Sequence, residues 1–257
     1  MLKKLIFMAG VWFCISGLAM AAETDLYEQI NRAGEQRMLS QRIAKSFSQM
    51  GLNVQAFVAK QEMDEAIKRF EANLNYLSSL SDPESKAAYE QLKGVWGPYR
   101  SAATGVPQRA TAIWLAHKSD DVLQAAETLV RHLQNSAGNA TRANARLVAQ
   151  AGRQRMLSQR IVKAYLLISW GDTSVVTREE LDAAVSDFSG GLASLRQMSG
   201  ASGSVKREME EMIQHWEWMQ AALAAEGATT YRLIVAEAGD ALLQSADRLT
   251  QLLASQR

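Results

Sequence analysis

A ten-residue stretch occurs twice in this chain and constrains the fold more than any other feature of the sequence. Residues 33–42 read Ala-Gly-Glu-Gln-Arg-Met-Leu-Ser-Gln-Arg, and residues 151–160 repeat nine of the ten at a spacing of 118. Repetition of this kind indicates tandem structural units. A purely structural helix can keep its apolar positions while its polar positions change, but here Gln36, Arg37 and Ser40 recur as well. The stretch, called the motif below, is therefore predicted to have a polar function.

Apolar residues recur at spacings of three and four, and sustained alternation with a period of two is absent, so an all-α fold is predicted. In the first half, Asp82 can cap a helix whose first residue is Pro83. Gly97-Pro98 is expected to end that helix, and Gly51 is expected to bend the motif helix. The helices expected in this half cover about 25–60, 62–80, 83–96 and 108–134.

The second half repeats this plan, with a motif helix over about 143–170, a capping box at Thr177–Glu180 and a last helix after Gly227. The apolar residues of its second helix stand 118 residues beyond their counterparts in the first half, and those of its fourth helix stand 120 beyond. The loops in the middle of the two halves therefore differ in length by two residues. We therefore predict eight helices as two tandem four-helix bundles, residues 22–138 and 139–257.

The segment 135–140 determines whether the two motif helices can pair within one chain. Gly138-Asn139 is typical of a turn, and a reversal there would let the bundles pair as an intramolecular pseudo-dimer. Ala137 and Ala140 are also compatible with a continuous helix, which would hold the bundles apart and require a second molecule for pairing. We favour the reversal.

The first 21 residues have the pattern of a secretory signal. Lys3 and Lys4 precede an apolar run, and Ala19-Met20-Ala21 supplies small residues for cleavage after Ala21. The alternative is an uncleaved membrane anchor, but the run is about 17 residues long, short for the roughly 20 that a span needs. The only cysteine, Cys14, lies in this signal, so the exported, periplasmic chain would contain no thiol.

Composition and motifs exclude several function classes. Without Lys3 and Lys4 the 28 basic residues fall to 26 against 27 acidic ones, so no general attraction to nucleic acid is expected. No nucleophile–base arrangement, phosphate-binding loop or metal-ligand motif is present, and we predict neither an enzyme nor a cofactor. A helix containing Met209, Met212, His215 and Met219 could hold soft copper, but packing by adaptable methionines is favoured.

The motif resembles the signature of the N-terminal sensor domain of type IV pilus methyl-accepting chemotaxis transducers (PilJ-like). That domain is similar to the periplasmic nitrate/nitrite sensor domain of NarX-like kinases. The resemblance implies a dimerising four-helix bundle that holds one nitrate between two motif helices, bound by the first motif arginine of each copy. Here those residues are Arg37 and Arg155. Because family members are membrane receptors and no signalling module follows here, we expect a separate membrane partner, such as a sensor kinase or chemoreceptor.

The first arginine of the motif shares a helix face with the glycine, the methionine and the second glutamine. A glycine within a helix costs about 1 kcal/mol relative to alanine, so its retention favours close approach of another backbone. Two such faces pressed together would bring Arg37 near Arg155. Guanidinium groups out of water repel unless an anion lies between them, and a planar oxyanion matches their donors. The alternative is pairing with a nearby glutamate, such as Glu28 or Glu35. The residues predicted to bind the ligand are Gly34, Arg37, Met38, Gln41, Gly152, Arg155, Met156 and Gln159.

The second motif arginines, Arg42 and Arg160, lie off this face and are expected to form structural salt bridges. Three functions stay open. The first is a periplasmic sensor that binds a small oxyanion, with nitrate or nitrite favoured, and signals to a separate partner. The second is a helical interaction or assembly module without a small ligand. The third is a soft-metal binder.

Overall fold

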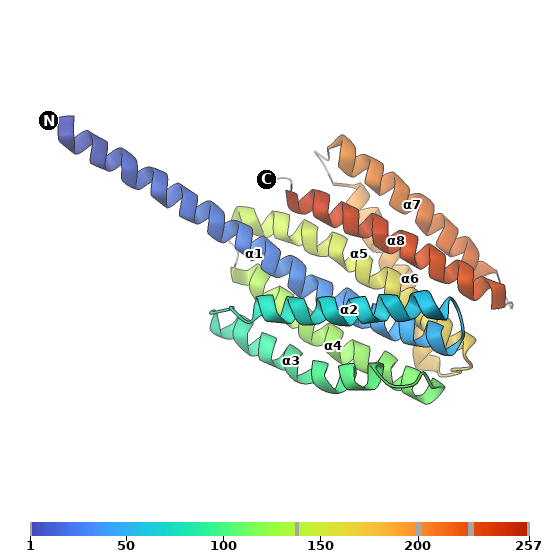
Figure 1. Ribbon diagram of the computed structural model, residues 1–257. Helices are drawn as coiled ribbons and strands as arrows, with labels where there is room; N and C mark the ends of the chain where they lie inside the picture. The colour runs from blue at the N-terminus through green and yellow to red at the C-terminus, as the bar shows by residue number, and fades with distance from the viewer. Residues whose placement is uncertain (1, 137–138, 199–201, 226–228, 256–257) are drawn as a thin grey trace.

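The structure, a computed structural model, describes the backbone of residues 2–136, 139–198, 202–225 and 229–255 (Figure 1). Side chains are described for residues 25–136, 146–198, 202–225 and 231–255. Within these ranges the chain forms eight helices and no strand, which confirms the predicted all-α fold. The helices are α1 (Leu2–Gly51), α2 (Ala56–Leu77), α3 (Pro83–Ala103), α4 (Arg109–Ser136), α5 (Asn139–Ser169), α6 (Val175–Arg196), α7 (Gly203–Ala224) and α8 (Thr229–Ser255).

The helices pack as two sets of four. In the first set, α1 packs against α2 and α4, and α3 packs against α4; in the second, α5 packs against α6 and α8, and α7 packs against α8. The sets meet where α1 and α5 lie side by side and run in the same direction, while the N-terminal part of α1 projects beyond the other helices (Figure 1). The turn predicted at Gly138-Asn139 lies partly outside the described residues. No helix in the described part of the chain is long and apolar enough to cross a membrane.

The same aromatic stack lies in the core of each set. Phe70 stacks on Trp96 with ring centroids 3.7 Å apart, and Phe188 stacks on Trp216 with centroids 4.4 Å apart. The phenylalanines are 118 residues apart and the tryptophans 120, the two spacings of the aligned apolar stripes. The repeat therefore governs core packing as well as sequence, and each stack contributes about 0.5–1.5 kcal/mol beyond its buried area.

The methionines of α7 are core residues. Met209, Met212 and Met219 are buried against the rest of the second set, which confirms the interpretation of this helix as a packing element. The nearby His215 has its Nδ1 2.7 Å from the Ser245 hydroxyl. Among the described residues, no group of three or more histidine, cysteine, aspartate or glutamate side chains could hold a metal ion.

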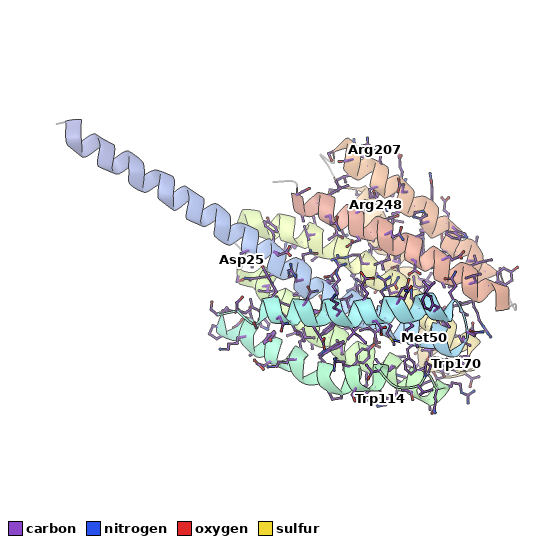
Figure 2. All side chains as sticks on the ribbon, in the orientation of Figure 1. Asp25, Met50, Trp114, Trp170, Arg207 and Arg248 are labelled. Carbon is purple, nitrogen blue, oxygen red and sulfur yellow. The ribbon has the colours of Figure 1, made fainter. Side chains whose placement is uncertain are left out.

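The motif helix α1 ends at Gly51, although the sequence predicted a helix to about residue 60. The Val54 N–H turns back to bond the backbone of α1 at 2.9 Å, and Asn53 adopts the left-handed region with φ of 55°, as is common at helix C-termini. Trp170, the residue after the end of α5, covers Gly51, because a Cβ on Gly51 would lie 1.8 Å from the Trp170 ring. Figure 2 shows Trp170 and Met50 at this shared end of α1 and α5.

The third helix continues through Pro98, where the sequence predicted a break. Proline removes the donor that would bond the Gly94 carbonyl, but Gly94 and Gly97 are exposed, so water can bond this carbonyl instead. On the opposite face Trp96 and Tyr99 are buried, and the Tyr99 hydroxyl donates to the backbone of α1 at 2.6 Å. Packing of this face therefore outweighs the local effect of the proline.

Side-chain caps begin three of the described helices, α3, α6 and α7. Asp82 accepts a hydrogen bond from the Ser85 N–H at 2.8 Å, which confirms its predicted role at the start of α3. The predicted capping box of α6 was wrong, because Ser174 is the cap and Val175 the first helical residue. Ser174 Oγ accepts from the Thr177 N–H at 3.3 Å. Thr177 therefore lies in the first turn, three residues after the true cap.

Candidate functional site

The two motif copies meet on α1 and α5, which pack against each other. Their first arginines, Arg37 and Arg155, are buried at this contact, with 3% and 2% of their surface exposed. Arg37 Nη2 donates to the Ala149 carbonyl on α5 at 3.5 Å, and Arg155 Nη2 donates to Asn31 Oδ1 on α1 at 3.0 Å. Positions 31 and 149 are 118 residues apart. Each arginine therefore reaches the equivalent position of the other repeat, and the contact is reciprocal.

In each set, a carboxylate on the fourth helix pairs with the arginine of the motif helix. Arg37 Nη1 donates to Glu127 on α4, and Arg155 Nη1 donates to Asp247 on α8 at 2.7 Å. The sequence predicted that an anion would offset repulsion between the two guanidinium groups, but the chain itself supplies negative charge there. The partner of Arg37 is also not a neighbour on its own helix, since Glu127 is 90 residues away.

Burial and charge act together on this cluster. Burial lowers the pKa of Arg37, and the charge of Arg155 also lowers it, while Glu127 acts in the opposite direction. Burial raises the pKa of Glu127, but the charge and hydrogen bond of Arg37 outweigh burial and hold that pKa below its ordinary value. The two arginines therefore interact electrostatically, and any added anion would compete with Glu127 and Asp247 for their donors.

The motif glycines leave room for the guanidinium groups. A Cβ on Gly34 would lie 3.1 Å from Arg37 Nη2. A Cβ on Gly152 would lie 3.2 Å from Arg155 Nη2 and 3.7 Å from Arg37 Nη2. The close approach predicted at these glycines therefore exists, but it comes from arginine side chains and not from another backbone.

The other four predicted ligand residues contact different parts of the structure. Met38 and Met156 are buried in the apolar core. Gln41 Nε2 donates to the Ser119 carbonyl on α4 at 3.3 Å, and Gln159 Nε2 donates to the backbone of α8 at 3.2 Å. The structure thus brings the arginines and glycines of both copies to one contact, while the glutamines hold each motif helix to the fourth helix of its own set.

A cluster of four charges, the first tetrad, lies further along α1. Lys45 is fully buried, and its Nζ lies 2.6 Å from Asp240 on α8 and 3.1 Å from Glu62 on α2. Arg42 pairs with the same Glu62 at 3.3 Å. Burial raises the pKa of Glu62, but the charges and hydrogen bonds of Lys45 and Arg42 together outweigh burial and keep that pKa below its ordinary value. Since Asp240 belongs to the second set, this tetrad joins the two sets.

An equivalent cluster, the second tetrad, lies on α5. Lys163, also fully buried, has its Nζ 2.6 Å from Glu180 on α6 and 3.7 Å from Asp120 on α4. Arg160 pairs with Glu180 at 2.9 Å and with Asp120 at 3.2 Å. Both tetrads confirm the prediction that Arg42 and Arg160 form structural salt bridges.

The one motif position that differs between the copies is explained by a reversed ion pair. In the first copy Glu35 pairs with Arg69 on α2 at 2.5 Å. In the second copy Arg153 pairs with Asp187 on α6 at 2.8 Å. Both members of the pair stand 118 residues from their counterparts. The charge signs are exchanged, and the contact between the motif helix and the second helix is kept.

Sequence reasoning missed the acidic partners of the arginines and lysines. Glu127 and Asp247 are 120 residues apart, as are Asp120 and Asp240, while Glu62 and Glu180 are 118 apart. These are the spacings that align the apolar stripes of the fourth and second helices. The same alignment applied to acidic positions would therefore have identified all six residues.

A comparison with protein families matches both halves of the chain. The profile of the family described as type IV pili methyl-accepting chemotaxis transducer N-term (PilJ) matches residues 20–126 and 139–256. Each match contains one copy of the motif, and together they cover most of the chain. The chain belongs to the PilJ family. No curated protein and no solved structure matches it.

The PilJ matches confirm the resemblance drawn from the motif, with two adjacent PilJ-like domains in one chain. PilJ domains are non-catalytic sensor domains of signalling chemoreceptors and are typically periplasmic, which indicates a chemotaxis-type sensor module. The similarity to NarX-like kinases stays a prediction.

Proposed function

We propose that this tandem PilJ chain is a periplasmic ligand-binding sensor, released by cleavage after Ala21. Its repeats, residues 22–138 and 139–257, would pair as an intramolecular pseudo-dimer and bind one small oxyanion, nitrate or nitrite, between the motif helices. The observation that carries this proposal is the burial of Arg37 and Arg155, one from each copy, at the α1–α5 contact. Buried cations need closely placed anionic partners, and the planar fork of arginine suits a planar oxyanion.

The oxyanion would take over donors that carboxylates now occupy. Arg155 Nε is buried and bonds no described residue, so one donor is already available. The side chains of Glu127 and Asp247 are 37% and 29% exposed, so either can turn towards water when an anion replaces it. One monovalent anion replaces one of the two negative charges, so charge compensation at the buried arginines requires the other carboxylate to stay paired. The free energy of the exchange is the difference between two sets of ionic hydrogen bonds.

This exchange would also provide the signal. Glu127 lies on α4 and Asp247 on α8, so release of either carboxylate would weaken the hold of that fourth helix on its motif helix. A shared anion would at the same time draw α1 and α5 together. A ligand that binds one arrangement better than the other shifts the equilibrium between them. A separate signalling partner, such as a membrane sensor kinase or chemoreceptor, would read the position of the fourth helices.

An assembly module without a small ligand is the alternative function, and one observation favours it. The two arginines and their two carboxylates already compensate each other in the described structure. In that case the motif helices would serve to join the two repeats and to present a surface to another protein.

A thermal-shift screen of small anions tests the proposed function. We expect nitrate or nitrite to raise Tm above the values in chloride and sulfate at equal ionic strength. When the anion concentration is a hundred times Kd, binding adds about 2.7 kcal/mol to the free energy of unfolding. For a protein of this size that corresponds to a rise in Tm of roughly 5–10 °C. The same shift should occur in Arg248→Ala, which removes an exposed arginine paired with Glu208 and Glu211. Equal Tm in all four anions would favour the assembly module.

A further inference from the structure

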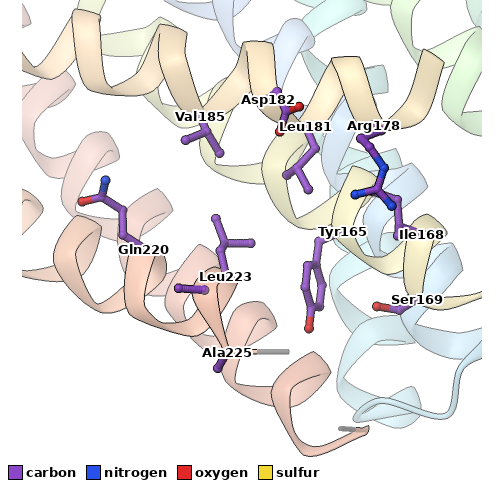
Figure 3. A pocket seen from close by; sticks show the side chains of 11 residues that line it. Tyr165, Ile168, Ser169, Arg178, Leu181, Asp182, Val185, Gln220, Leu223 and Ala225 are labelled. Atoms are coloured by element: carbon purple, nitrogen blue, oxygen red, sulfur yellow. The ribbon is translucent and has the colours of Figure 1, made fainter. Parts of the chain in front are cut away.

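A cavity of about 710 Å³ lies between α5, α6 and α7, beyond the C-terminal end of the second motif. In Figure 3, Leu181 from α6 and Leu223 from α7 point into the same space, and the Tyr165 ring of α5 lies beside them. Its size is within the range of roughly 300–1,000 Å³ that is typical of ligand sites. Its lining includes the apolar Leu181, Val185 and Leu223 and the polar Tyr165, Arg178 and Asp182.

The same region of the first set is filled. Positions 118 residues before Tyr165, Leu181 and Val185 hold three fully packed side chains, whereas these three residues are only partly buried. The packing of the third helices differs in the same way. The backbone of α3 comes close to α1 and α2 as well as α4, whereas the backbone of α7 comes close mainly to α8, and α7 reaches α6 through the Phe188–Trp216 stack. The packed counterparts in the first set are Phe47, Met63 and Ile67.

The charges at the rim differ between the sets in the same way. Lys60 and Asp64, one turn apart on α2, pair with each other at 2.7 Å. Their counterparts on α6 are Arg178 and Asp182, and neither side chain bonds a described residue. The second set therefore presents an unpaired cation and an unpaired anion beside an apolar cavity, where the first set has a closed ion pair over a filled core.

We propose that this cavity binds a small zwitterion with an apolar side chain, an α-amino acid or a dipeptide. Arg178 would receive the carboxylate, because its fork matches two carboxylate oxygens. Asp182 would receive the ammonium group, and the apolar side chain would lie between Leu181 and Leu223. This site is separate from the arginine contact of the motif, so the second PilJ domain would respond to a ligand of a different class.

Calorimetry on the full chain tests this proposal, with L-leucine and L-leucyl-L-leucine as probes. We expect at least one probe to bind, and the better one reports the ligand size. N-acetyl-leucine lacks the ammonium group and leucinamide lacks the carboxylate. The affinity of each should therefore be lower than that of leucine by a factor of roughly ten or more. Arg178→Gln and Asp182→Asn should weaken the better probe by a similar factor. The matched variants Lys60→Gln and Asp64→Asn should leave its affinity unchanged.

A cavity-filling pair of variants checks the location independently of charge. Val185→Phe should fill the open cavity, keep the protein folded and weaken the better probe at least tenfold. Ile67→Phe places the same ring in the filled region of the first set, so it should lower Tm without changing affinity. Absence of binding by both probes up to about 10 mM, or equal affinity in wild type, Arg178→Gln and Val185→Phe, would overturn the proposal. The nitrate response of Arg178→Gln should equal that of wild type, which keeps this test independent of the motif site.

Discussion

Lys45→Met is expected to lower the free energy of unfolding by about 3 kcal/mol, the low end of the cost of removing one partner from a buried ion pair. The Lys45 side chain is fully buried, while Glu62 and Asp240 are 16% and 25% exposed, so water offsets part of the loss. Methionine keeps most of the apolar length of lysine. The cost therefore reports the lost charge, which leaves Asp240 without its cation. Urea unfolding followed by circular dichroism measures the change.

Two matched variants sharpen this expectation. Lys163→Met should cost less than Lys45→Met, because Arg160 still pairs with both acids of the second tetrad. Lys60→Met removes a lysine from an exposed pair with Asp64 and should cost under about 0.5 kcal/mol. A cost for Lys45→Met equal to that of Lys60→Met would show that the first tetrad does not join the two sets.

The cost of Lys45→Met should also depend on pH in a defined direction. Lys45 and Arg42 hold the pKa of Glu62 below its ordinary value of 4.5 in the folded protein, despite burial. Stability from a lowered carboxyl pKa is present above the unfolded value and is lost as pH falls through the folded value. The difference between wild type and Lys45→Met should therefore persist at neutral pH and shrink below about pH 4.5.

Arg37→Ala and Arg155→Ala are each expected to weaken nitrate or nitrite binding at least tenfold. The loss should be larger if the replaced arginine donates two hydrogen bonds to the anion. Hydrogen bonds to charged groups contribute about 1.5–3 kcal/mol each. The double variant should bind little more weakly than either single variant, because the first substitution already removes the shared site. Lysine at either position should restore only part of the affinity, since a point charge lacks the fork.

Controls separate this effect from general damage. Arg37→Ala deprives Glu127 of its main partner, so circular dichroism must show that each variant is folded before its affinity is compared. Arg248→Ala removes an exposed arginine of the same chain and should bind as wild type does. Anion binding that survives in Arg37→Ala/Arg155→Ala would place the anion elsewhere.

Patterns that repeat along the chain predicted the fold well. The apolar spacing and the duplicated motif predicted eight helices. Aligning the two halves with offsets of 118 and 120 pairs residues that occupy equivalent positions in the structure, such as the stacks Phe70–Trp96 and Phe188–Trp216. Local rules predicted helix ends less well. Pro98 lies inside α3 because Trp96 and Tyr99 hold the opposite face, and no local rule includes that packing.

The sequence singled out Arg37 and Arg155, but it could not show which groups compensate them. The fourth helix of the first half carries three acids, the adjacent Asp120 and Asp121 and, two turns later, Glu127. Only the helix positions select Glu127 for Arg37 and Asp120 for the second tetrad. The glycine argument predicted a close approach at Gly34 correctly but assigned it to a backbone, because helix periodicity does not show how a flexible guanidinium folds back. The anion itself stays a proposal.

Joining two PilJ domains in one chain lets the two halves differ, which two identical subunits could not do. The ion pair Glu35–Arg69 appears with reversed charge as Arg153–Asp187. The region that Phe47 fills in the first set is an open cavity beside Tyr165 in the second. Differences of this kind allow one half to acquire a ligand that the other cannot bind, while the α1–α5 contact is kept.

The stoichiometry of anion binding tests the central claim most directly, namely that one chain contains both halves of the arginine site. Nitrate or nitrite is titrated calorimetrically into the purified protein, and light scattering of the same sample gives its molar mass. The structure, with Arg37 and Arg155 at one intrachain contact, predicts one anion bound per chain by a monomer. One anion per two chains, bound only by a dimer, would contradict the account.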